Sequence, residues 1–89
     1  MQQRPVIIIN KLGLHARAAA RFVTTASSFS SHVDVAKNGQ HVNGKSIMGV
    51  MMLAASRGTE LVIMTHGDDE IEAADSLVKL VEERFGEQE

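Results

Sequence analysis

The sequence predicts an α+β fold, a two-layer open-faced sandwich in which three helices cover one face of a four-stranded antiparallel sheet. Runs of β-branched residues and segments of helical period follow each other in the order βαββαβα. The dipeptide Asn38-Gly39 separates two alternating segments, which predicts a tight antiparallel hairpin. No linker or internal repeat interrupts the 89 residues, so we expect a single domain over residues 1–89.

The first half of the chain predicts one strand, one helix and the hairpin. The β-branched residues 6–9 predict a strand with Pro5 at its start, where a missing N–H is tolerated. Apolar residues at helical spacing predict a helix from residue 16 to about residue 27. Residues 32–37 and 40–43 are the predicted strands of the hairpin.

The second half predicts a short helix, a strand and a longer helix. Ser46 is a typical N-cap and predicts a helix from residue 47 to about residue 55, with Gly58 closing it in the left-handed conformation. Residues 60–65 predict the last strand.

The last predicted helix has its own start and stop signals. Asp69 and Glu72 have the spacing of a capping box, and Gly86 is expected to end the helix. The expected apolar stripe consists of Ile71, Ala74, Leu77, Val78, Val81 and Phe85.

Charge is distributed unevenly along the chain. Residues 1–67 carry a net charge of +5 and residues 68–89 carry −7, so the longer part suits an anionic ligand or an acidic partner. Nucleic acid is disfavoured because the chain has no Trp, no Tyr and no Lys/Arg-rich run. There is no signal-peptide pattern, no apolar run near the ~18 residues of a membrane span, and no cysteine. We therefore expect a cytoplasmic monomer without membrane contact.

The stretch Gly13-Leu14-His15-Ala16-Arg17 places a histidine at the mouth of the first predicted helix. The first N–H groups of a helix lack intrahelical partners and the dipole is positive there, so the amides of Ala16, Arg17 and Ala18 can hold a phosphate. The Arg17 guanidinium would add a bidentate donor. Neutral imidazole is a nucleophile near pH 7, so His15 could carry a phosphoryl group. No acid is near in sequence to compete, although a plain polar cap would look the same.

No other pattern predicts chemistry. The remaining histidines, His32, His41 and His66, have no metal-ligand spacing and are expected at the surface. We predict neither a cofactor nor a metal, and no hydrolase or P-loop arrangement is present.

The second predicted helix is apolar on nearly all sides. Val50 and Leu53 are the expected core residues, with part of Ile47. Three methionines, Met48, Met51 and Met52, are either an exposed and adaptable partner surface or fillers of gaps in the core. Ser46 is either a plain N-cap or a phosphorylation switch at the start of this helix.

Two motifs resemble the HPr family, the histidine-containing phosphocarriers of the phosphotransferase system. They are Gly13-Leu14-His15-Ala16-Arg17 and Gly44-Lys45-Ser46-Ile47-Met48-Gly49-Val50-Met51. The resemblance implies that His15 accepts a phosphoryl group on Nδ1 from an enzyme I relative and passes it to an enzyme IIA relative. It implies that Arg17 balances the phosphate charge and that Ser46 is the target of HPr kinase/phosphorylase where that enzyme exists.

The resemblance also implies a docking surface on the first two helices. It maps to Ala16, Arg17, Ala20, Arg21 and Thr24 together with Ile47, Met48, Met51 and Met52. On this interpretation the protein is a phosphotransfer intermediate rather than a catalyst acting on a small substrate.

One departure bears on the branch of the family. Sugar-branch members usually have proline where this chain has Ala18, and residues 11–20 look more like the nitrogen-branch carrier, NPr. The alternatives are a sugar-branch HPr controlled through Ser46, and a regulatory binding protein whose partners respond to phosphorylation of His15. A small nucleic-acid or metal-binding module is the interpretation outside the family.

Overall fold

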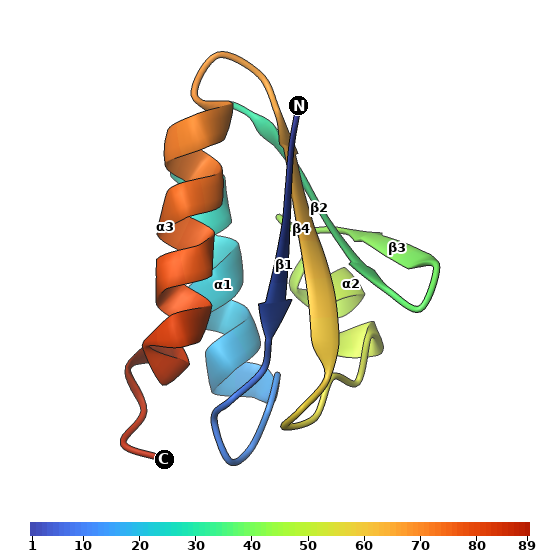
Figure 1. Cartoon of the computed structure of the whole chain (residues 1–89), viewed down its shortest axis with the longest axis vertical. Coiled ribbons are helices and arrows are strands. Elements are labelled where there is room, and N and C mark those ends of the chain that lie inside the picture. Colours follow the sequence, from blue (N-terminus) through green and yellow to red (C-terminus); the bar gives the residue numbers. More distant parts are fainter.

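The computed structural model describes all residues, 1–89. The chain folds in the predicted order and adds one 3₁₀ turn at its end (Figure 1). The elements are β1 (Gln2–Ile7), α1 (Ala16–Ser27), β2 (His32–Lys37), β3 (Gln40–Asn43), α2 (Ile47–Met52), β4 (Glu60–His66), α3 (Glu70–Glu82) and the 3₁₀ turn η1 (Arg84–Gly86).

The four strands form one antiparallel sheet in the order β1-β4-β2-β3. Alternate residues of the two central strands, such as Val33, Val35, Leu61 and Ile63, are buried, while their neighbours are partly or fully exposed. The helices pack on the buried face, with α1 and α3 side by side along it (Figure 1). This arrangement confirms the predicted two-layer α+β sandwich and its hairpin.

The first strand differs from the prediction because it begins earlier. It starts at Gln2 and ends at Ile7, and Pro5 lies in its middle, paired with Val62. A proline is tolerated there because β1 is an edge strand, so its missing N–H costs no ladder hydrogen bond on the open side. Ile8 follows the strand, yet its side chain is fully buried in the hydrophobic core, and its backbone N–H donates to the Thr59 carbonyl at 2.9 Å.

The second helix is shorter than predicted. It ends at Met52 instead of near residue 55, and Ala54 has a φ of 50°. The chain must leave the helix here because the segment after it runs against the loop before α1, where the Leu14 N–H donates to the Ala55 carbonyl at 2.9 Å. Gly58, with a φ of 89°, therefore shapes the turn into β4 and does not cap α2.

The predicted capping box of the last helix is wrong. The Asp69 carboxylate makes no cap hydrogen bond and instead accepts hydrogen bonds from the backbone N–H groups of Ser30 and Ser31, each at 2.9 Å, and from the Ser31 hydroxyl. Asp69 thus ties the start of α3 to the loop before β2. Glu70 takes the role at the helix start, accepting a hydrogen bond from the Gly67 N–H at 3.2 Å.

The end of α3 also differs from the prediction. The helix ends at Glu82, and Phe85 is buried from the following turn rather than from the helix stripe. Ile71, expected in that stripe, is 53% exposed. Arg84, Phe85 and Gly86 are all left-handed, with φ of 58°, 55° and 80°. This turn redirects the chain after α3 and brings the last three residues, 87–89, to the mouth of α1.

Candidate functional site

His15 is the N-cap of α1, as its position in the sequence predicts. Its backbone is extended, with φ −71° and ψ 177°, and its carbonyl accepts the first helical hydrogen bond, from the Ala19 N–H at 2.8 Å. The imidazole makes no hydrogen bond to the helix. The N–H groups of Ala16, Arg17 and Ala18 have no acceptor within the protein, as is usual for the first turn of a helix.

The loop before His15 is held by close backbone contacts. Gly13 has a φ of 65°, and a Cβ at this position would lie 2.4 Å from the Ala55 carbonyl oxygen, so the loop tolerates only glycine there. Asn10 is fully buried, and its Nδ2 donates to the Gly13 carbonyl at 2.8 Å. These contacts fix where His15 leaves the loop and enters α1.

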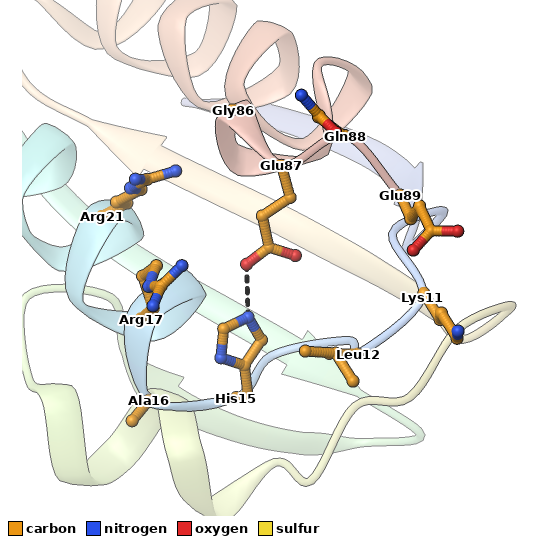
Figure 2. Close-up of a pocket in the computed structure, with 10 residues that line it drawn as sticks. All are labelled: Lys11, Leu12, His15, Ala16, Arg17, Arg21, Gly86, Glu87, Gln88 and Glu89. Carbon is orange, nitrogen blue, oxygen red and sulfur yellow. Dashed lines mark hydrogen bonds and ion pairs between the residues drawn. The ribbon is translucent and has the colours of Figure 1, made fainter.

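A carboxylate from the other end of the chain meets the His15 ring. Glu87 Oε2 pairs with His15 Nε2, and Glu87 Oε1 accepts a hydrogen bond from Asn10 Nδ2 at 2.9 Å (Figure 2). In Figure 2 the other ring nitrogen, Nδ1, points away from Glu87 and toward the side of the first turn of α1. Nδ1 makes no hydrogen bond to the protein, so it is the open nitrogen of the ring.

The surroundings of Glu87 favour its ionised form. Burial raises the pKa of this carboxyl, whereas the hydrogen bonds from Asn10 and His15 lower it. The charge of Arg17, and that of the His15 ring when it is protonated, act in the same direction, and together these effects outweigh burial, so the pKa of Glu87 lies below its ordinary value. The side chain is 14% exposed, so water competes little for the pair.

These groups line a cleft of about 790 Å³ between the mouth of α1 and the end of the chain. Its lining residues are Lys11, Leu12, His15, Ala16, Arg17, Arg21, Gly86, Glu87, Gln88 and Glu89. The Arg17 side chain lies on the cleft wall, is exposed and makes no hydrogen bond to the protein. Arg21 differs, because its guanidinium donates to the Phe85 carbonyl and so helps hold the turn after α3.

The second predicted feature, the apolar surface of α2, is exposed. Met48 is 69% and Met52 67% exposed, and Ile47 and Met51 are also exposed, whereas Val50 is fully buried. The methionines therefore do not fill gaps in the core. We call the four residues Ile47, Met48, Met51 and Met52 the α2 patch.

The start of α2 adjoins this patch, and α1 is the neighbouring helix. The Ser46 hydroxyl accepts a hydrogen bond from the Gly49 N–H at 3.2 Å, which confirms it as the N-cap. Helix α1 packs against α2 and exposes Ala20, Arg21 and Thr24, which line a second hollow that reaches Leu80 of α3. The predicted partner-binding residues thus lie on two helices that pack against each other.

The comparison with known proteins decides the family. The family model of the PTS HPr component phosphorylation site matches residues 2–83. This chain belongs to the HPr family. HPr proteins of Cupriavidus necator and of Neisseria meningitidis serogroup B are 54% and 55% identical to it, each over 89 residues and 100% of both chains. The crystal structure of HPr-C-His from Thermoanaerobacter tengcongensis is 50% identical, with a TM-score of 0.96 over 100% of both chains.

As a member of the HPr family the protein is a phosphocarrier of the phosphotransferase system, which takes a phosphoryl group from an enzyme I and delivers it to an enzyme IIA. The relatives are named HPr, so the comparisons do not assign the nitrogen branch. No helix of this HPr-family chain has the length and apolar character needed to cross a membrane. No group of three or more His, Cys, Asp or Glu side chains has the geometry of a metal site.

Two residues that contact each other at the site, Asn10 and Glu87, are not predicted from the sequence. No acid is near His15 in the sequence, yet Glu87 reaches the ring across 72 residues, so the ring does have an acidic neighbour in the fold. Glu87 belongs to an acidic end that includes Glu82, Glu83 and Glu89, and nothing in the order of these residues singles it out. Asn10 directly follows the β-branched residues 6–9, and its place in the sequence predicts no role at the site. The usable signal is Phe85, an apolar residue whose burial fixes the end of the chain.

Proposed function

We propose that His15 is the phosphoryl acceptor and that the group is carried on Nδ1. The observation that carries this proposal is the open Nδ1 on the side of three amides without acceptors, at Ala16, Arg17 and Ala18. Three backbone N–H groups and the positive end of α1 suit the dianionic oxygens of a phosphoryl group. The Arg17 side chain, which has no protein partner, is free to add a bidentate contact.

The phosphoryl transfer needs no reacting group beyond the His15 ring and the histidine of the partner protein. The Nδ1 lone pair attacks phosphorus on the phosphorylated enzyme I, a bond from Nδ1 to phosphorus forms, and the bond to the donor nitrogen breaks with its electron pair leaving to the donor. The same steps run in the other direction when a histidine of enzyme IIA attacks. Catalysis on this protein therefore consists of positioning and charge stabilisation, as in other phosphoryl transfers.

Phosphorylation by an enzyme I homologue with phosphoenolpyruvate tests the acceptor. The wild type should become a phosphoprotein that is labile in acid and stable in base, and His15→Ala should not. His41→Ala is the matched control, because His41 is exposed on β3 and makes no contact with the cleft. Equal phosphorylation of His15→Ala would refute the assignment.

We also propose that the α2 patch and the exposed side of α1 dock both partners. An apolar and flexible methionine surface beside the phosphoryl site adapts to more than one protein. Met48→Glu should weaken binding to an enzyme I or enzyme IIA by at least about tenfold, because it places a charge in an apolar contact. Ile71→Glu, an equally apolar exposed position on α3, should leave binding unchanged.

The branch of the system is a finer proposal. Ala18 in place of proline supports the nitrogen branch and supplies a third backbone N–H for the phosphate. Transfer from the phosphorylated protein to a nitrogen-type and to a sugar-type enzyme IIA, measured side by side, tests it. Faster transfer to the sugar type would instead favour the sugar-branch alternative.

Ser46 is proposed as a regulatory site where an HPr kinase/phosphorylase exists. A phosphate on Ser46 would add about −1.5 to −2 charges next to the α2 patch, stabilising the helix start and repelling an acidic partner. Incubation with that kinase should label the wild type and not Ser46→Ala. Label retained in Ser46→Ala would place the modified residue elsewhere.

A second candidate function is supported by the exposure of the α2 patch. In this proposal the protein is a regulatory binding partner, and phosphorylation of His15 only sets its binding state. A partner whose affinity collapses in Met48→Glu but ignores Arg17→Ala and phosphorylation would favour it over phosphoryl transfer.

A further inference from the structure

Three polar side chains from distant parts of the chain form a row at the cleft. Asn10 Nδ2 donates to Glu87 Oε1 at 2.9 Å, and Glu87 Oε2 pairs with His15 Nε2 (Figure 2). Asn10 is fully buried, so the donor that orients Glu87 cannot turn to solvent. The row ends on the ring whose other nitrogen, Nδ1, lies on the side of the first turn of α1.

We propose that Glu87 is a positioning residue that holds His15 in its Nε2–H tautomer and so directs the phosphoryl group to Nδ1, with Asn10 orienting Glu87. For the transfer step the proposal rests on the proposed acceptor role of His15. For the state of the ring it stands on the contacts alone.

The direction of the effect follows from what each group can donate. An ionised carboxylate only accepts hydrogen bonds, so the ring nitrogen that faces Glu87 must carry the hydrogen. In neutral imidazole the other nitrogen, Nδ1, then holds the lone pair and is the nucleophile. In the catalytic triads of hydrolases, an aspartate carboxylate selects the tautomer of its histidine partner in the same way.

The end of the chain is built to keep Glu87 in place. Phe85 is fully buried, and its carbonyl accepts a hydrogen bond from the Arg21 guanidinium on α1. On the far side of Glu87, the Lys11 N–H donates to the Glu89 carbonyl at 2.5 Å. Glu87 is thus anchored before and after, and the contact with His15 is not the chance position of a loose terminus.

Glu87 also suits the charge changes of the transfer. When Nδ1 forms its bond to phosphorus and Nε2 keeps its hydrogen, the ring gains a positive charge, which the adjacent carboxylate compensates. When the phosphoryl group leaves to the next histidine, the electron pair of the broken bond returns to Nδ1 and the neutral Nε2–H ring is restored. No proton has to leave or return during the cycle, and Glu87 stays on the side of the ring away from phosphorus.

The first test reads the tautomer directly. Ring ¹⁵N chemical shifts of His15 distinguish a protonated from an unprotonated nitrogen in the full-length protein at a pH where the ring is neutral. The ratio of Nε2–H to Nδ1–H should fall by about tenfold or more in Glu87→Ala, since a charge-assisted hydrogen bond is lost. Glu87→Gln keeps the length of the side chain and removes its charge, so its tautomer ratio should lie between those of the wild type and Glu87→Ala.

Glu89→Ala is the matched control. Glu89 lies two residues further along, lines the same cleft and carries the same charge, but its side chain makes no hydrogen bond or ion pair with the protein. Its variant should keep the wild-type tautomer ratio. A backbone spectrum of each variant shows whether Phe85 stays packed, which separates a lost contact from a lost fold.

The second test uses phosphoramidate, a small phosphoryl donor that needs no enzyme and releases ammonia as its phosphorus–nitrogen bond breaks. The wild type and Glu89→Ala should be phosphorylated on Nδ1, whereas Glu87→Ala should form a share of Nε2-phosphohistidine, seen by ³¹P and ¹⁵N spectra. An unchanged tautomer ratio in Glu87→Ala, or Nδ1 product alone, would overturn the proposal. If instead enzyme I fails to phosphorylate the wild type while the ratio still shifts, the acceptor role fails and the positioning role stands.

Discussion

The two sides of the His15 ring are assembled in different ways. The Nδ1 side is local, because Gly13, His15 and the amides up to Ala18 follow each other in the sequence. The Nε2 side is assembled at a distance, because Glu87 reaches the ring across 72 residues and is oriented by Asn10. A helix cap depends on neighbouring residues, whereas a contact from the end of the chain depends on how α3 packs beside α1.

The difference divides the chemistry of the site as well. The local side offers backbone donors and an arginine to an incoming anion and stays open. The distant side offers a carboxylate to the ring and is mostly buried. In the proposed function, His15 carries the phosphoryl group on Nδ1 and keeps a hydrogen on Nε2, so each nitrogen of the ring has its own role.

The largest expected effect on stability comes from removing Phe85, the buried residue that holds the Nε2 side of the site in place. Phe85→Ala removes a fully buried aromatic side chain and should lower the free energy of unfolding by about 4 kcal/mol. Urea denaturation measures this loss, and Ile71→Ala, at an exposed position on α3, should change it by less than about 0.5 kcal/mol. A loss below that of Ile71→Ala would mean that the end of the chain is not packed in solution.

Breaking the local side at the loop should have the next largest effect. Gly13→Ala combines a left-handed backbone with a close contact to the Ala55 carbonyl, and should cost about 3 kcal/mol of stability. Gly39→Ala is the matched control, because Gly39 is also left-handed, with φ 83°, but has open space around it and should cost only about 1 kcal/mol. Equal losses in denaturant would refute the role of the close approach.

Arg17 tests the chemistry of the local side without touching its structure. The side chain is exposed and unpaired, so Arg17→Ala should change stability by less than about 0.5 kcal/mol. The rate of phosphoryl transfer should fall roughly tenfold, because a charged donor to the phosphoryl oxygens is lost. Rapid-quench kinetics measures the rate, and a normal rate would remove Arg17 from the site.

The smallest effect concerns acid stability far from the site. Hydrogen bonds from Ser31 and Ser30 lower the pKa of Asp69 from 3.8 to about 2. Because the folded pKa is lowered, the stabilisation by Asp69 is present above pH 3.8 and is lost as the pH falls toward 2. Asp69→Asn should flatten the pH dependence of stability in this range only, which unfolding measured between pH 2 and pH 6 would show. An unchanged slope would mean that Asp69 titrates alike in both states.

Much of the fold follows from local patterns. The order of elements, the Asn38-Gly39 hairpin and the Ser46 cap appear where periodicity and turn chemistry place them. The errors lie at element ends. Asp69 binds the loop at Ser30 and Ser31 instead of its own helix, and α2 stops at Met52 because the next residues must pass the loop at Gly13. In both places a contact from a distant segment overrides the local signal.

The sequence alone determined the helix mouth, with His15, Arg17 and the free amides, and the apolar excess of α2, because caps and amphipathic faces depend on residues within a few positions of each other. Only the tertiary structure decided that Asn10 and Glu87 meet the ring and that Arg21 holds the end of the chain. Glu87 is one of several glutamates in an acidic segment, and its contact with His15 arises from the burial of Phe85 and the left-handed turn around it. The helix mouth can thus be predicted from composition and spacing, while the partner of its ring depends on packing between the two ends of the chain.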